Sequence, residues 1–131
     1  RRVHPSYPNR WRDQVKAMAF FMEMLDADIP CIAVENPVPL KRVQRCIGKY
    51  TQAVQPWQFG DELTKRTCFW LKNLPPLEPT EIVPEDRRHA ACHLEPPGPE
   101  RGTNRSRTPP GLARAMALQW SNAAIKYKEQ K

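Results

Sequence analysis

The sequence has no long run of apolar residues and no two cysteines close enough for a Cys-x-x-Cys pair. A membrane-spanning helix needs about 20 apolar residues in succession, and a signal peptide needs a shorter apolar core near the N-terminus. We therefore expect a soluble, cytoplasmic protein without a membrane partner. The four cysteines lie far apart, which favours a reducing compartment over a disulfide framework.

Proline and positive charge are abundant instead. The chain has 131 residues, of which 15 are proline, and its formal net charge is +7. This length is typical of one compact domain. A basic protein attracts polyanions such as nucleic acid; the other interpretation is that the charge only keeps a small protein soluble. The sequence starts at Arg1, so we expect a processed chain or one that begins inside a longer gene product.

Two segments repeat apolar residues at the spacing of an amphipathic helix. The second of them begins at Pro110 and closes the chain. A short basic helix is expected between them, opened by Pro39 and stopped by Gly48. The first segment runs from about Asn9 to Asp26, and its apolar stripe consists of Trp11, Val15, Met18, Met22 and Leu25.

Three short segments predict strands. Residues 31–35 form an apolar run that ends in Glu35, which predicts a central parallel strand buried on both faces. Ligands bind beyond the carboxyl ends of such strands, where this assignment places Glu35. Residues 50–55 and 67–71 can pair as an antiparallel hairpin. From Lys72 to about Thr108, prolines and charges predict little regular structure.

These elements predict an α/β fold with three parts. Residues 1–74 form an α/β half, residues 75–109 a Pro-rich irregular segment, and residues 110–131 a closing helix with a charged tail. The tail is expected to fray because its residues are polar and terminal.

Three strings of the chain resemble late motifs of cytosine-5 DNA methyltransferases. Residues 32–37 (IAVENP) resemble their Glu-Asn-Val motif, and residues 59–71 resemble their Tyr-Gly-x-Pro-Gln-x-Arg-x-Arg strand motif. Residues 107–117 resemble their last motif, where a proline turn leads into the closing helix. The joined strings are similar to those of a compact, phage-type branch of the family. The resemblance implies the C-terminal part of a Rossmann-like methyltransferase fold in a bacterial or phage-infected cell.

The departures from the family pattern are equally specific. The Gly-containing turn that holds S-adenosylmethionine and the Pro-Cys motif that supplies the nucleophile do not occur in the sequence. The resemblance therefore implies S-adenosylmethionine-dependent DNA methylation only with a separate N-terminal half, and we expect the chain alone to be inactive. DNA is the expected partner, together with that half or a second copy of the chain. The alternative is a non-catalytic, basic nucleic-acid-binding or assembly protein on a methyltransferase-derived scaffold.

The resemblance also assigns roles to residues of the first string. Glu35 corresponds to the acid that protonates, or hydrogen-bonds, ring nitrogen N3 of a flipped cytosine, a task suited to a carboxyl with a raised pKa. Asn36 and Pro37 would orient this substrate-binding loop. The alternative is that Glu35 caps the following helix and that Asn36 only makes an Asx-turn.

Basic residues supply the other candidate DNA contacts. Lys65 and Arg66 correspond to the position that steers the base or a phosphate; alternatively they form a solvated shoulder paired with Asp61 and Glu62. A further group lies in the Pro-rich segment and can bind phosphates as it becomes ordered, or can belong to a disordered linker. This group consists of Arg87, Arg88, Arg101, Arg105 and Arg107.

Two other features of the sequence are of a kind that can bind ligands. His89, Cys92 and His93 form the only metal-like cluster in the sequence, but zinc sites usually need four ligands at set spacing, so we expect no metal. Trp57 follows Pro56 in an expected loop and is the tryptophan best placed to stack on a base, although packing in the protein is the commoner role.

Overall fold

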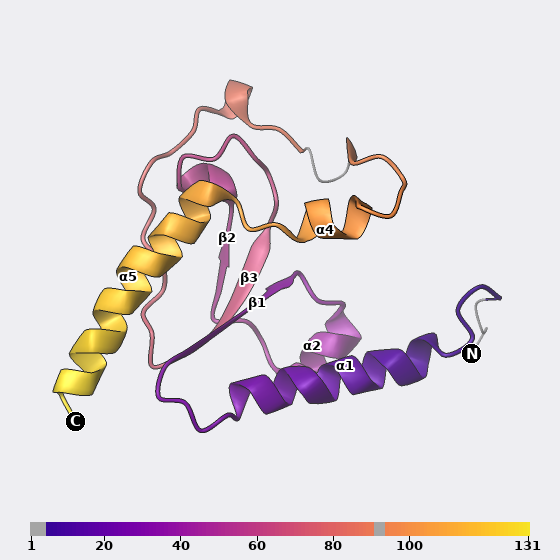
Figure 1. Ribbon diagram of the computed structural model, residues 1–131, viewed down its shortest axis with the longest axis horizontal. Coiled ribbons are helices and arrows are strands. Elements are labelled where there is room, and N and C mark those ends of the chain that lie inside the picture. Colours follow the sequence, from indigo (N-terminus) through magenta and orange to yellow (C-terminus); the bar gives the residue numbers. More distant parts are fainter. Residues whose placement is uncertain (1–4, 91–93) are drawn as a thin grey trace.

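The computed structural model describes residues 5–90 and 94–131. Helices lie on both faces of a small sheet, so the fold is a mixed α/β arrangement (Figure 1). The elements follow the order α1 (Arg10–Leu25), β1 (Ile32–Pro37), α2 (Lys41–Ile47), β2 (Gln52–Val54), the 3-10 turn η1 (Pro56–Gln58), β3 (Thr67–Lys72), the 3-10 turn η2 (Glu85–Arg87), α4 (Arg101–Ser106) and α5 (Pro110–Glu129).

The sheet has three strands in the order β1-β3-β2. Both outer strands run antiparallel to β3, and their registers place Glu35 and Gln52 on either side of Phe69. The antiparallel pairing expected for residues 50–55 and 67–71 is confirmed, although β2 is shorter than the alternating segment. Residues Thr67 to Trp70 of β3 are all buried, as a central strand requires.

The expected position of residues 31–35 is wrong. They do not form a central parallel strand: within the described part of the chain, β1 lies at the edge of the sheet and is antiparallel to its one neighbour. Only alternate residues, Ile32 and Val34, are buried. A run of four apolar residues fits a strand covered on one face as well as one covered on both, so composition alone did not distinguish the two cases.

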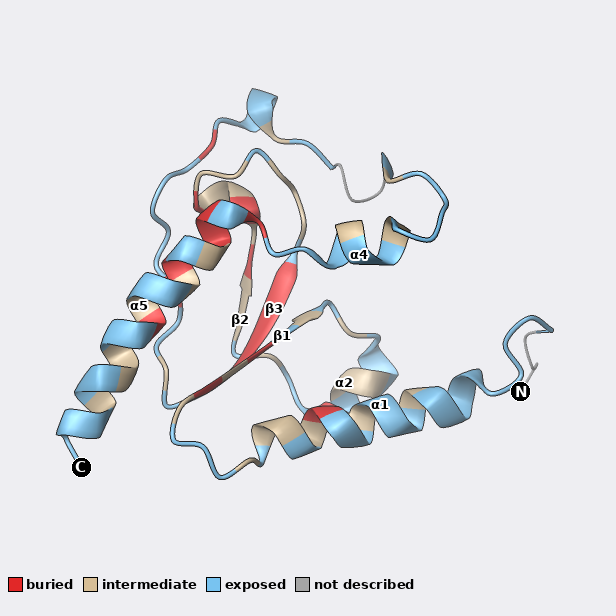
Figure 2. Cartoon of the chain, viewed as in Figure 1, coloured by how far each residue is buried: buried red, intermediate tan, exposed pale blue. Residues whose placement is uncertain are grey.

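Each face of the sheet carries its own hydrophobic core (Figure 2). Successive side chains of a strand point to opposite faces, so β3 contributes Phe69 to one core and Trp70 to the other. On the α5 face, Phe69 packs with Val54, Phe59, Leu77, Leu112, Ala115 and Trp120. On the α1 and α2 face, Trp70 packs with Phe21, Ile32, Val34, Ile47 and Cys68.

Helix α1 is confirmed, but only part of its expected stripe is covered. Phe21 is buried and packs edge-on against Trp70, with ring centroids 4.8 Å apart. The N-terminal half extends beyond the sheet and α2 (Figure 1). Trp11 and Val15 therefore remain 49% and 43% exposed. The apolar period correctly predicts the helix, whereas the length of the covered stripe depends on how far the sheet reaches.

The start of α5 is fixed by a residue far away in the sequence. Both oxygens of the Asp61 carboxylate accept hydrogen bonds, one from the backbone N–H of Gly111 at 2.8 Å and one from that of Leu112 at 2.9 Å. They satisfy N–H groups that have no partner within a helix. A side chain at position 111 would not fit, because its Cβ would overlap the backbone oxygen of Phe59.

The segment that follows β3 is irregular but well held. Gln52 exchanges two hydrogen bonds of 2.8 Å with the backbone of Leu77, and Gln119 exchanges two of 2.9 Å with the backbone of Glu78. The indole N–H of Trp120 donates to the carbonyl oxygen of Pro75. The expectation of little regular structure between Lys72 and Thr108 holds for this part, but α4 and η2 correct it further on.

No helix in the described ranges combines the length and the apolar character that a membrane crossing would require.

Candidate nucleic-acid-binding pocket

A pocket of about 450 Å³ lies where the end of β1, the start of β3 and helix α4 meet. This volume is within the range of about 300–1,000 Å³ that is usual for small-molecule sites. All three strings that resemble methyltransferase motifs, or segments adjoining them, contribute to its wall. Its lining consists of Glu35, Pro37, Thr64, Lys65, Arg66, Thr67, Gly102, Arg105 and Ser106.

Glu35 is the acidic residue of this lining. It stands opposite Phe69 in the sheet register, so its side chain belongs to the same face as the α5 core. The residue as a whole remains exposed, yet partial burial of the carboxyl raises its pKa above the ordinary value, and the nearby positive charge of Lys65 opposes that rise. A carboxyl whose pKa is shifted in this direction keeps its proton to a higher pH than an ordinary glutamic acid, as a proton donor requires.

Lys65 contacts α4 through its ammonium group. The ammonium donates hydrogen bonds to the backbone carbonyl oxygens of Arg105 at 2.7 Å and of Arg107 at 3.2 Å. Carbonyls at the end of a helix lack partners within the helix and favour a cation. Lys65 therefore holds α4 against the start of β3. The paired shoulder with Asp61 or Glu62 is not formed, because Asp61 caps α5 and Glu62 pairs with Arg87.

Besides Lys65, two arginines, Arg66 and Arg105, contribute positive charge to the pocket. The Arg66 guanidinium donates to the hydroxyl of Tyr50 at 3.3 Å and is otherwise exposed. Arg105 is exposed on α4, and in the described ranges neither its side chain nor that of Arg107 pairs with an acid. Arg105 and Arg107 therefore remain able to contact a phosphate, with fork-shaped donors that suit bidentate binding.

Asn36 and Pro37 differ in their relation to the pocket. Pro37 lines it and ends β1 opposite Thr67. Asn36 stands opposite Cys68, so it belongs to the other face of the sheet and does not line the pocket. Glu35 does not cap α2, which was its alternative role. The N-cap position of that helix is occupied by Leu40, and no side chain of the described residues makes a capping hydrogen bond there.

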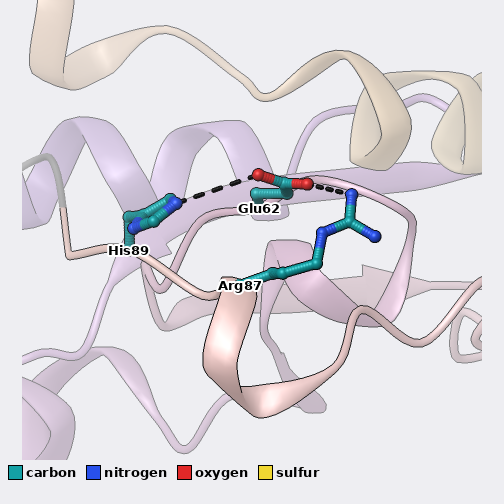
Figure 3. A network of polar contacts seen from close by, with 3 residues as sticks. All are labelled: Glu62, Arg87 and His89. Carbon is teal, nitrogen blue, oxygen red and sulfur yellow. Dashed lines mark hydrogen bonds and ion pairs between the residues drawn. The ribbon is translucent and has the colours of Figure 1, made fainter.

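Four of the expected arginines do not line the pocket: Arg87, Arg88, Arg101 and Arg107. Arg87 pairs with Glu62, whose other oxygen is 3.8 Å from His89 Nε2 (Figure 3). Arg88 lies with its guanidinium carbon 3.6 Å from the ring centroid of Trp57 and donates to the carbonyl oxygen of Val83.

Arg101 belongs to the base of α4. Its guanidinium donates to the carbonyl oxygen of Glu95, and Asn104 donates to the Glu95 carboxylate at 2.7 Å. Arg101 therefore helps to fold the segment before α4. Because Arg88 already covers Trp57, the expected stacking of a base on this tryptophan would first require Arg88 to move.

The cysteine and histidine residues that could have formed a metal site do not form one cluster among the described residues. Cys92 and His93 lie outside the described residues, and His89 contacts Glu62. Across residues 5–90 and 94–131, no three His, Cys, Asp or Glu side chains converge as a metal site would require. Cys68 is fully buried, and this burial raises the pKa of its thiol, so it is a poor nucleophile.

Some members of the pocket were not anticipated from the sequence. Gly102 and Ser106 line the pocket because α4 lies against the start of β3. The bond that holds α4 there joins Lys65 to the backbone carbonyl of Arg105, and a bond to a backbone group leaves no pattern in the sequence. Asp61 positions α5 from 50 residues away, as its bond to Gly111 shows.

Comparisons with models of protein families, with curated proteins and with solved structures found no match.

Proposed function

We propose that this chain is the DNA-binding half of a cytosine-5 methyltransferase-like protein. It binds duplex DNA through its basic residues and takes an extruded cytosine into the pocket beside Glu35. A separate half supplies the methyl donor and the nucleophile. The chain alone transfers no methyl group.

One observation carries the proposal. The pocket brings the glutamate of the first string together with Lys65 and Arg66 of the second and with Arg105, two residues before the third. These segments are far apart in the sequence, and the same grouping follows from the family resemblance of the strings. A carboxyl with a raised pKa beside unpaired arginines suits a nucleotide, which offers ring nitrogens and a phosphate within one ligand.

The roles divide by chemistry. Glu35 in its protonated form donates to N3 of cytosine, which draws electron density from the ring and makes carbon C6 more electrophilic. Arg105 and Arg107 contact the backbone, where a guanidinium neutralises phosphate without reading sequence. Lys65 positions α4 and, with it, Arg105. An extruded base costs less to accept when it is unpaired or mismatched.

The glycine turn at the start of α5 offers no free backbone donors for S-adenosylmethionine. The N–H groups of Gly111 and Leu112 both donate to Asp61, and a Cβ at Gly111 would meet the Phe59 backbone. No step of methyl transfer is therefore assigned to this chain. A non-catalytic DNA-binding protein on the same scaffold is the second candidate, favoured by the burial of Cys68, the thiol within the second string.

Binding measurements on the intact chain test the proposal. Fluorescence anisotropy with a labelled duplex, between about 50 and 200 mM salt, should show affinity that falls steeply with salt, because phosphate contacts release counterions. Calorimetric titration with S-adenosylmethionine should show no binding. Duplex affinity that does not change with salt contradicts the proposed partner, and methyl transfer by the chain alone contradicts the proposed division into halves.

A further inference from the structure

Positive and negative charges are segregated along the chain. Between Glu35 and Asp61 there is no acidic residue, whereas this interval contains Lys41, Arg42, Arg45 and Lys49. Between Lys72 and Arg87 the pattern is reversed, because all four charged residues there are acidic: Glu78, Glu81, Glu85 and Asp86. Opposite charges concentrated in different segments orient a protein in the field of a polyanion.

Helix α2 turns its basic residues away from the protein. Val43 and Ile47 pack into the core with α1, so they define the inner side of the helix. Successive helical residues are rotated by about 100°, which puts Lys41 and Arg45 on the side opposite the core and Arg42 on its flank. All three are exposed, and so is Lys49 just after the helix.

These four side chains have no acidic partner in the described part of the chain. The ion pairs found there join Glu62 to Arg87 and to His89, and α1, the helix packed against α2, sends neither Asp13 nor Glu23 into a pair with it. The first turn of α2 contains two cations and no acid. Cations at this end oppose the helix dipole, so the arrangement does not serve the stability of α2.

Arg66 connects this surface to the pocket. It lines the pocket and donates to the hydroxyl of Tyr50, which follows α2 closely in the sequence and packs in the same core as Val43. Helices α2 and α4 both lie to the right of the sheet in Figure 1, away from α5. A ligand that reaches from Arg66 onto α2 must offer negative charges at several positions in succession.

We propose that Lys41, Arg42, Arg45 and Lys49, here called the α2 basic surface, bind the phosphate backbone of duplex DNA next to the pocket. This inference rests on the proposed function and extends it. Duplex DNA carries one negative charge per roughly 1.7 Å of axis, so it supplies the repeated charges that a single nucleotide lacks. The acidic segment between Lys72 and Arg87 faces away from the backbone in the bound state.

A matched pair of variants tests the inference. K41Q/R42Q/R45Q/K49Q removes the α2 basic surface, and R114Q/K126Q/K128Q/K131Q removes the same number of exposed charges from α5 and its end. Anisotropy titrations against salt should show that the α2 variant binds duplex DNA at least about tenfold more weakly. Its salt slope should be flatter by about two or more, at about one for each phosphate that the protein no longer neutralises. The α5 variant should keep the slope within about one of the wild-type value.

The single reversals R45E and R114E repeat the comparison with less risk to folding, and R45E should weaken binding more than R114E. Equal losses in both pairs would show an effect of net charge alone and overturn the inference. It is also overturned if the α2 variant impairs binding to polyglutamate but not to DNA, which would indicate an acidic protein partner. If duplex binding requires α2 but Glu35→Ala prefers an extruded cytosine as strongly as the wild type does, the inference stands and the proposed function fails.

Discussion

The carboxylate of Asp61 accepts a hydrogen bond of 2.8 Å from the backbone N–H of Gly111, across 50 residues of sequence. This contact joins the turn before β3 to the start of α5. The turn leads to Lys65, which bonds to the backbone of Arg105 in α4, and α5 follows α4 in the chain. The other oxygen of the Asp61 carboxylate accepts a hydrogen bond from the N–H of Leu112, so one side chain from a distant segment caps α5. The position of α4 at the pocket depends on both ends being fixed in this way.

Asp61→Ala should lower the free energy of unfolding by about 1–2 kcal/mol, the usual cost of losing a helix N-cap. The carboxylate also lies at the positive end of the helix dipole. Urea denaturation followed by circular dichroism measures the change. The adjacent Glu62→Gln, which breaks only an exposed ion pair with Arg87, should cost less than about 1 kcal/mol. Equal costs for the two variants would argue against the cap.

Gly111→Ala should destabilise the protein by about 3 kcal/mol, because a Cβ there would overlap the Phe59 backbone oxygen, which has no room to move. Gly102→Ala is the matched control. It lies in α4 with no atom within 4 Å of the added Cβ, so the better helix propensity of alanine should stabilise it by up to about 1 kcal/mol. Midpoints that move in the same direction for both would contradict this packing.

Lys65→Met should loosen α4 without unfolding the sheet. A helix this short is unstable in isolation, so its backbone depends on contacts such as the bond from Lys65 Nζ to the carbonyl oxygen of Arg105. Hydrogen exchange of the amides in Arg101–Ser106 should become about tenfold faster, corresponding to a loss of roughly 1.4 kcal/mol. Lys72→Met removes a comparable ammonium bond, to the carbonyl oxygen of Ala27, and should leave α4 exchange unchanged.

Glu35 should impose a pH dependence on stability that Glu35→Gln removes. The folded state raises the pKa of this carboxyl above its ordinary value of 4.5, so the folded state binds more protons within the window just above that value. The stabilising contribution is then complete below the window and is lost as pH rises through it. Urea midpoints over this range should fall for the wild type relative to Glu35→Gln. A relative gain with rising pH would reverse the sign of the pKa shift.

The sequence carried enough information for α1, α2, α5 and β3, but not for α4. The apolar period at Met18, Met22 and Leu25 predicted α1, and the apolar run from Cys68 to Leu71 predicted a strand. Both predictions succeeded because the spacing of apolar residues reflects directly which side of an element packs against a core. Four residues chosen from the sequence, Glu35, Lys65, Arg66 and Arg105, line one pocket, and their role there stays a prediction.

The parts that failed depend on partners rather than on local pattern. The edge position of β1 is set by β3, which pairs on both sides and leaves β1 outside. Arg87 and Arg101 were expected to be free for DNA but bind Glu62 and the Glu95 carbonyl. A guanidinium has the same sequence signature whether its acceptor is a phosphate or a nearby oxygen of the protein.

The measurement that tests the central claim most directly compares two duplexes that differ in one nucleotide. One is fully paired, and in the other a cytosine stands opposite an abasic site, which lowers the cost of extruding it. The ratio of the two affinities isolates the pocket from the backbone contacts. It should be determined for the wild type and three variants, Glu35→Gln, Glu35→Ala and Arg105→Ala/Arg107→Ala, at about pH 5 and about pH 8.

The wild type should prefer the extruded cytosine by about tenfold, the upper scale of a hydrogen bond between uncharged groups, with a larger preference at the lower pH, where a larger share of Glu35 is protonated. Glu35→Gln should keep a preference that does not vary with pH, because its amide donates to N3 in either buffer. Glu35→Ala should lose the preference, and the double arginine variant should weaken both duplexes equally. A Glu35→Ala variant whose preference equals that of the wild type at both pH values would contradict the assignment of this pocket to the base.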